Sequence, residues 1–145
     1  MTPLLKISNL YVNFQVRKSK FSAVKNFNLL IKKNQIVGLV GESGSGKSVT
    51  AMSIMRLLQE PKASYGEKSS IEFDGEEILS ANKKSLRKIR GNKISMIFQE
   101  PMTSLNPYHK VGDQIVESIL LHKKQHKHDA ILEAKNLMGL VEIPD

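Results

Sequence analysis

The sequence predicts an α/β fold in which antiparallel β-strands come first, a phosphate-binding loop follows, and α-helices come last. Three observations predict it. Residues 4–31 are rich in β-branched and aromatic side chains, a glycine-rich loop at 41–48 separates an apolar run from a helical pattern, and helical periodicity begins at Val111. At 145 residues the chain has the length of one domain, which buries about 70% of its unfolded surface.

The first third of the chain is expected to be β-structure. Residues 4–14 and 23–31 have the composition and alternation of strands, and Lys33-Asn34 is a plausible turn after them. The next run, "QIVGLV" at 35–40, is short and unbroken in its apolar character. Such a run predicts a strand that is buried on both faces.

The segment after the glycine-rich loop is expected to be helical. Apolar residues in "KSVTAMSIMRLL" recur mainly at helical spacings, which predicts a helix ending near Gln59 to Pro61. Residues 60–69 are expected to form a loop. Asp74-Gly75 then interrupts an alternating apolar stretch and is the strongest short hairpin signal in the chain.

A short basic helix is expected next, with Ser80 or Asn82 as its N-cap and Gly91 as its terminator. The apolar residues 94–98 after it predict another buried strand. Two amphipathic helices then complete the chain, "VGDQIVESILLHK" and "DAILEAKNLMGLV". Asp129 is the expected N-cap of the second helix.

The bulk composition excludes several classes of protein. The chain has no cysteine, which excludes a disulfide scaffold and a thiolate metal site. Neither a basic flank with an apolar core nor a run of ~18–20 apolar residues occurs, so we expect a cytosolic chain without a signal peptide or transmembrane helix.

The net charge of +8 includes one local cluster of basic residues, which consists of Lys83, Lys84, Arg87, Lys88, Arg90 and Lys93. Two interpretations of it remain open: a solvated helix face and a surface that binds an anionic partner. Aromatic residues make up only 6% of the chain, which leaves few platforms for stacking single-stranded nucleic acid.

The glycine-rich loop "GESGSGKS" at 41–48 fits the P-loop pattern G-x-x-x-x-G-K-[ST] at every fixed position. Glycines allow the backbone N–H groups to converge on phosphate oxygens, and the following helix adds the positive end of its dipole. Lys47 is expected to place its ammonium against the outer phosphates, and the Ser48 hydroxyl is expected to bind Mg²⁺. The sequence therefore predicts a P-loop NTPase core.

A guanine-selecting Asn-Lys-x-Asp motif would need an aspartate at position 95 after Asn92-Lys93, and the residue there is Ser95. GTP is therefore disfavoured as the ligand.

The stretch "SMIFQEP" at 95–101 contains a second candidate site, because it ends an apolar run with Gln99 and Glu100. A carboxylate that holds Mg²⁺ at the end of such a strand is usually an aspartate, and here Gln99 takes that place. Pro101 follows Glu100 directly and begins a loop. We therefore favour Gln99 as the functional residue, with Glu100 as a catalytic base the alternative.

Two segments, "GLVGESGSGKSVTAMSIMRLL" and "ISMIFQEPMTSLNPYHKVGDQIVESI", resemble the ATP-binding subunits of ABC transporters. The likeness is greatest to importers of the peptide/nickel type, which include the oligopeptide and dipeptide permeases, and it extends over Leu4 to Asp145. It implies that 1–145 is the N-terminal part of a single ABC nucleotide-binding domain. Residues 1–100 would form the β-rich edge and P-loop core, and 101–145 the Q-loop and the start of a helical subdomain.

The resemblance implies specific roles for these residues. The Walker A residues that bind ATP would be Gly41, Glu42, Ser43, Gly44, Ser45, Gly46, Lys47, Ser48 and Val49. Gln99 would be the Q-loop glutamine, which touches the Mg²⁺ or the attacking water, and Ser48 would be the other Mg²⁺ ligand. The aromatic residue that stacks on adenine would be Phe14, where most members have tyrosine, and the nearby Tyr11 is the alternative.

The resemblance also implies partners. A transmembrane permease would dock on 100–111, a second ATPase subunit, identical or paralogous, would complete the site, and an extracytoplasmic solute-binding protein would act indirectly. The subunit would be peripheral, on the cytoplasmic face of the inner membrane, and would energise import of di- or oligopeptides or nickel-type solutes. No nucleic-acid partner is expected; the alternative is a nucleic-acid-dependent P-loop ATPase that uses the basic residues of 83–93.

Several motifs of the family do not occur among the 145 residues: the LSGGQ-type signature, the Walker B aspartate with its following glutamate, and the switch histidine. The intact protein is therefore expected to be a transport-coupled ATPase. This chain alone is expected to bind ATP without hydrolysing it.

Overall fold

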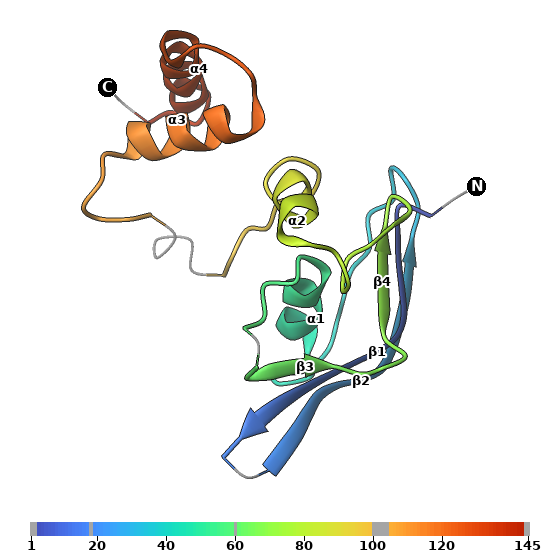
Figure 1. Cartoon of the computed structure of the whole chain (residues 1–145). Helices are drawn as coiled ribbons and strands as arrows, with labels where there is room; N and C mark the ends of the chain where they lie inside the picture. The colour runs from blue at the N-terminus through green and yellow to red at the C-terminus, as the bar shows by residue number, and fades with distance from the viewer. Residues whose placement is uncertain (1–2, 18, 60, 100–104, 144–145) are drawn as a thin grey trace. The chain divides into compact units, whose positions relative to one another are not determined.

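The computed structural model describes residues 3–17, 19–59, 61–99 and 105–143 (Figure 1). They divide into two compact units, and the boundary along the chain falls between Leu86 and Arg87. The strands are β1 (Leu5–Val16), β2 (Ser19–Ile31), β3 (Ala63–Tyr65), β4 (Ser70–Phe73) and β5 (Glu76–Glu77). The helices are α1 (Lys47–Ile54), α2 (Lys83–Ile89), α3 (Val111–His122) and α4 (Lys127–Leu140).

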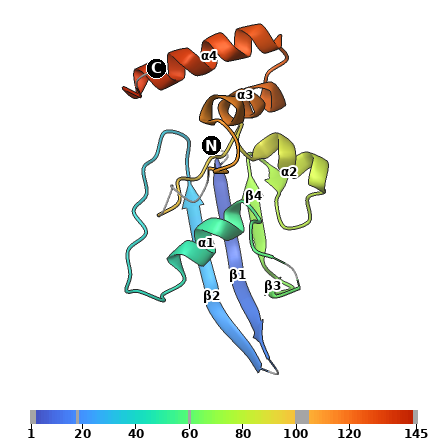
Figure 2. The same cartoon turned by 90° about the vertical axis from the view of Figure 1, so that its left-hand side faces the viewer.

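The first unit is built on an antiparallel sheet with the strand order β2-β1-β4-β5, in which β3 also pairs with β1. The two predicted N-terminal strands are confirmed as β1 and β2, which form a long hairpin. Leu5, Ile7, Leu10 and Val12 of β1 are all buried, so this strand supplies much of the core. Figure 2 shows α1 beside one face of the hairpin.

Helix α1 begins where the sequence predicts, at Lys47, but it ends at Ile54 and not near Gln59. The physical reason is local, since Arg56 takes a left-handed conformation with φ of 48°. A residue in that conformation just after a helix ends its hydrogen-bond ladder.

The hairpin predicted at Asp74-Gly75 is confirmed. Both residues have positive φ, at 49° and 82°, which is the geometry of a tight two-residue turn between antiparallel strands. The expectation of a plain loop at 60–69 is wrong, because β3 forms there and pairs with the outer half of β1. Ala63 and Ser64 have little β-propensity of their own, and they become part of a strand because β1 offers them backbone partners.

Helix α2 has the cap that the sequence predicts. The side-chain Oδ1 of Asn82 accepts a hydrogen bond from the backbone N–H of Ser85 at 2.9 Å, which makes Asn82 the N-cap. Gly91 has φ of 76°, so it supplies the left-handed residue expected after the helix.

Two predicted buried strands, at 35–40 and 94–98, are wrong. Within the described residues neither run belongs to a strand, and the second makes only an isolated bridge between Arg90 and Ile94. Ile36 is 100% exposed and Ile97 is 91% exposed. An apolar run becomes a buried strand only when adjacent strands satisfy its backbone, and no described strand lies against either run.

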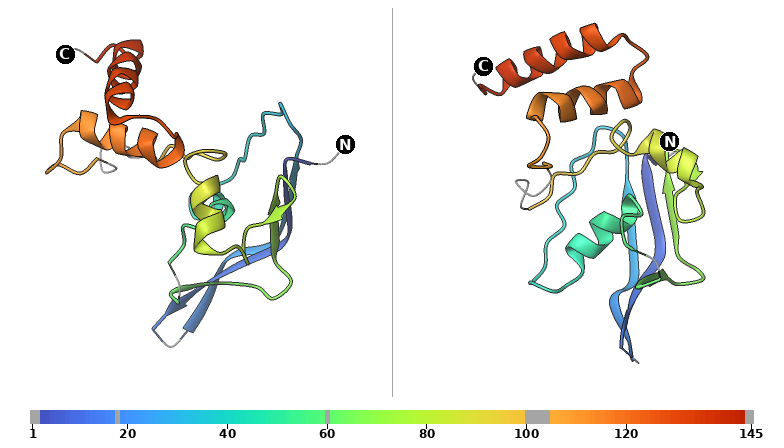
Figure 3. Two further views of the ribbon diagram at one scale, coloured as in Figure 1. Left: turned by 45° about the horizontal axis from the view of Figure 1, so that its top comes forward. Right: turned by 60° about the vertical axis from the view of Figure 1, so that its left-hand side comes forward.

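The second unit contains α3 and α4, which lie side by side (Figure 3). A small apolar core of Val116, Ile119, Ala130 and Ala134 joins them. The expected cap at Asp129 is wrong, because α4 begins at Lys127 and Asp129 lies in its first turn. A carboxylate there still interacts favourably with the helix dipole.

Lys123, in the loop between α3 and α4, forms an ion pair with Glu133 of α4. The ion pair holds this loop against α4. The hydrogen bond from Lys123 holds the pKa of the Glu133 carboxyl below its usual value, and Gln125 acts in the same direction. Across the described residues, each helix is too short or too polar to cross a membrane.

Replacing Asn82 with alanine is expected to lower the free energy of unfolding by about 1 kcal/mol, because the N–H of Ser85 loses its partner. Asn82→Asp, which keeps an acceptor at the cap, is expected to stay near the wild type. Urea denaturation followed by circular dichroism measures both. Ser80→Ala is the matched control, and a loss there equal to that of Asn82→Ala would show that the cap has been assigned to the wrong residue.

Candidate nucleotide site

The P-loop ends at the N-terminus of α1 in a conformation that leaves backbone donors available. Gly46 precedes the helix with φ of 89° and makes no side-chain cap. The N–H of Thr50 is bonded to the Gly46 carbonyl at 2.8 Å, as the first bond of the helix. The N–H groups of Lys47, Ser48 and Val49 therefore have no intrahelical partner, which is the arrangement that binds anions.

Gly46 also brings the loop against β2 at very short range. A Cβ atom built on Gly46 would lie 2.6 Å from the carbonyl oxygen of Ala23 and 3.1 Å from Cγ2 of Val24. The position thus excludes a side chain on steric grounds as well as by its backbone angle. Gly44 also has a positive φ, at 82°, but a Cβ atom built there would meet no other atom within 4 Å.

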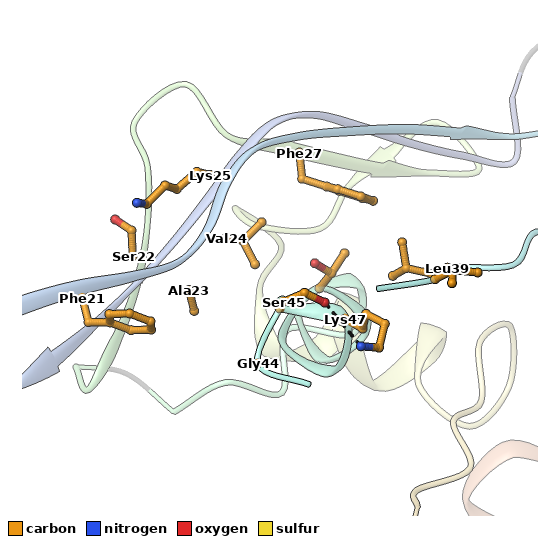
Figure 4. A pocket seen from close by; sticks show the side chains of 13 residues that line it. Phe21, Ser22, Ala23, Val24, Lys25, Phe27, Leu39, Gly44, Ser45 and Lys47 are labelled. Carbon is orange, nitrogen blue, oxygen red and sulfur yellow. Dashed lines mark hydrogen bonds between the residues drawn. The ribbon is translucent and has the colours of Figure 1, made fainter. Parts of the chain in front are cut away.

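The Lys47 ammonium is held by the loop itself. Nζ donates to the carbonyl oxygens of Gly41 and Glu42, both at 2.6 Å. It also donates to Oγ of Ser45 at 3.3 Å, as Figure 4 shows. These bonds place a positive charge next to the free N–H groups of the first turn. Ser48 lies in the same turn and is exposed.

A cavity of about 470 Å³ opens between the P-loop and β2 (Figure 4). Its lining residues are Phe21, Ser22, Ala23, Val24, Lys25, Phe27, Leu39, Val40, Gly44, Ser45, Gly46, Lys47 and Thr50. Sequence reasoning found only the P-loop side of this cavity. The β2 side was missed, although the pairing of β2 with the strand that contains Phe14 is a signal that could have identified it.

Phe14 lies directly opposite Phe21 in the ladder between β1 and β2, and opposite Ala63 of β3 on its other side. Directly opposed residues of an antiparallel pair project on the same face. Tyr11 is three residues away on β1, so the alternation of the strand directs it to the other face. Its backbone N–H, in the plane of the sheet, donates a hydrogen bond to Oγ of Ser69 at 2.9 Å.

Gln99 belongs to the second unit, where it is exposed in a bend. Glu100 and residues 101–104 lie outside the described residues, so the choice between Gln99 and Glu100 stays a prediction. Of the expected docking segment 100–111, the structure describes the part from residue 105 onward, and Gln114 holds this part by hydrogen bonds. Its amide bonds both the N–H and the C=O of Asn106, at 2.9 and 3.0 Å, and the carbonyl of His109.

Within the described ranges, no three His, Cys, Asp or Glu residues are grouped so as to hold a metal ion. A Mg²⁺ ion at the P-loop would instead take oxygen ligands from the Ser48 hydroxyl and from bound phosphate, and such hard oxygen donors suit this cation.

Of the basic cluster, Lys83, Lys84, Arg87 and Lys88 are all exposed.

Residues 24–145 match the family model of the ABC transporter. The chain is 44% identical over its whole length to the oligopeptide transport ATP-binding protein OppD of Haemophilus influenzae, and spans 44% of that protein. It is 40% identical to the OppD protein of Bacillus subtilis, with 99% of this chain and 40% of that protein covered. It is also 40% identical to the glutathione import ATP-binding protein GsiA of Escherichia coli O6:H1, with 98% of this chain and 23% of that protein covered.

The fold also resembles a solved structure, a dimer of the ATP-binding cassette MJ0796 in a post-hydrolysis state with ADP and Pi. The TM-score is 0.79 at 22% identity, with 97% of this chain and 58% of that chain covered. The α/β fold of a P-loop NTPase predicted from the sequence is confirmed by this likeness.

Gly46→Ala is expected to destabilise the first unit strongly, because the new Cβ would meet the Ala23 carbonyl as well as the strain of a left-handed backbone. Gly44→Ala is the matched control. It introduces only the backbone strain, about 1–2 kcal/mol. Urea midpoints should fall further for Gly46→Ala than for Gly44→Ala, and equal losses would contradict the close approach to β2.

Proposed function

The chain belongs to the ABC transporter family, and from that membership we propose that it is the ATP-binding part of an ATPase that energises import of di- or oligopeptides. The observation that supports ATP binding best is the position of Lys47, whose ammonium lies beside the free N–H groups at the start of α1. The names of relatives that transport oligopeptides support the choice of solute, and nickel-type solutes are the second candidate.

The triphosphate would bind with its outer oxygens on the first-turn N–H groups of Lys47, Ser48 and Val49. The Lys47 ammonium would exchange its bonds to the Gly41 and Glu42 carbonyls for bonds to phosphate. A unit charge pair at 4 Å contributes about 4 kcal/mol at an effective dielectric constant of 20. The exchange is favourable because a phosphate bears full negative charge and the carbonyls bear only dipoles.

We propose that Mg²⁺ takes its protein ligands from the Ser48 hydroxyl and from Gln99. When bound, the ion neutralises charge on the β- and γ-phosphates. The chain's own contribution is to orient the phosphates with backbone donors and to fix the position of the Ser48 oxygen at the start of α1.

Coupling to transport is proposed to pass through Gln99 and the segment 100–111 to the permease, with a second ATPase subunit closing on the nucleotide. The hydrogen bonds of Gln114 to Asn106 and His109 support a docking role, since they hold the end of that segment in one shape. Tyr108 in this segment is 93% exposed and offers a large contact surface.

Lys47→Ala is expected to weaken Mg-ATP binding to this chain by about 10- to 100-fold, since a hydrogen bond to a charged group contributes about 1.5–3 kcal/mol. Isothermal titration calorimetry measures the affinity. Lys33→Ala, an exposed lysine in the turn after β2, is the control. ATP binding that is indifferent to Lys47→Ala would contradict the site.

Turnover of ATP by this chain alone is expected to be negligible, both in the wild type and in Glu100→Gln. A coupled phosphate-release assay measures it. If the wild type hydrolyses ATP and Glu100→Gln abolishes the reaction, Glu100 is the catalytic base. The assignment of Gln99 as the functional residue of "SMIFQEP" would then be wrong.

A further inference from the structure

Phe21 has no role in the site described so far, although its ring lies on the cavity wall. The residue is 59% exposed and lines the same cavity of about 470 Å³ as Gly44, Ser45 and Lys47. In Figure 4, Phe21 and Ala23 project from β2 on the side of the P-loop, while Ser22 and Lys25 project on the opposite side. An exposed aromatic residue alone needs no explanation, but one beside a phosphate-binding loop does.

The pairing of β1 with β2 fixes the direction of this ring. Asn13 pairs with Ser22, and the Ser22 hydroxyl donates a hydrogen bond to Oδ1 of Asn13 on the face away from the P-loop. The adjacent pair, Phe14 and Phe21, must therefore project on the P-loop face. Two aromatic rings stand side by side there on neighbouring strands.

The position of this pair along β2 matches the part of a nucleotide beyond its phosphates. Ala23 lies against Gly46 of the P-loop. Phe21 is two residues further along the strand, or roughly 7 Å. A ligand with its phosphates on the first turn of α1 would thus present its other end to the two rings.

We propose that Phe21 is a second base-stacking residue, which together with Phe14 forms an aromatic platform for the nucleobase. The inference rests on the proposed function, because it assumes that the P-loop holds a nucleoside triphosphate. Phenyl rings offer a face and no hydrogen-bonding group, and the Ser22 hydroxyl is already bonded to Asn13. The platform would therefore increase affinity without distinguishing one base from another.

The test compares ligands with and without a base. Binding of Mg-ATP, Mg-GTP and inorganic tripolyphosphate to this chain is measured by calorimetry for the wild type, Phe21→Ala and Phe21→Leu. Phe21→Ala is expected to weaken ATP and GTP binding alike, by about 5- to 100-fold, which corresponds to the loss of one stacking contact. Tripolyphosphate binding is expected to be unchanged.

Two further variants make the result specific. Phe21→Leu keeps an apolar side chain of similar size and is expected to lose nearly as much ATP affinity, because leucine cannot stack. Tyr11→Ala removes an aromatic residue from the opposite face of β1. It is expected to leave the affinities for ATP and for tripolyphosphate unchanged. A loss of ATP affinity in Tyr11→Ala that matches the loss in Phe21→Ala would place the base on the other face and overturn the inference.

The inference and the proposed function fail in different ways. If the wild type binds neither ATP nor tripolyphosphate, the proposed function fails, and the inference with it. If ATP binding depends on Lys47 but Phe21→Ala and Phe21→Leu bind as the wild type does, only the stacking role is overturned. Loss of tripolyphosphate binding in Phe21→Ala would show that the ring maintains the shape of the loop, and this too overturns stacking.

Discussion

The contact between Gly46 and the Ala23 carbonyl is the constraint on which the rest of the first unit depends. It joins the P-loop to a strand more than twenty residues earlier, and it leaves no room for even one methyl group. Because this contact sets the distance from the first turn of α1 to β2, it also sets the width of the cavity between them. The anion site and its apolar wall are thus parts of one packing arrangement.

Strand β2 is irregular at the point of this contact. Val12 pairs with Val24 and Asn13 pairs with Ser22, so Ala23 is an extra residue in the ladder. A bulge of this kind leaves one residue unpaired and redirects the side chains around it. Phe21 and Val24 are three residues apart and would face opposite sides of a regular strand. With the bulge, both face the P-loop, while the Ala23 carbonyl is turned towards Gly46.

The features that sequence reasoning predicted correctly are those encoded within a few residues. The start of α1 after Gly46, the Asp74-Gly75 turn and the Asn82 cap each depend on local backbone preferences, so the local sequence suffices. The failures at 35–40 and 94–98 have the opposite origin, because a buried strand exists only where neighbours complete its ladder. Strand β3 was missed for the same reason, since its partner β1 is distant in sequence. Phe21 was missed because its place beside the P-loop depends on the packing of β2 against Gly46.

The bonds of Lys47 have a consequence for how the proposed site would bind its ligand. An ammonium has three donor hydrogens, and here its partners are the two carbonyls of Gly41 and Glu42 and the hydroxyl of Ser45. The loop is therefore held curled by the group that would meet the phosphates, so little backbone entropy remains to be lost on binding. Bonds to a phosphate would replace bonds that already exist, and the net gain would come from charge and not from the number of hydrogen bonds. A site of this kind favours the most highly charged phosphate group it can reach, and any affinity for the rest of the ligand must come from the β2 wall.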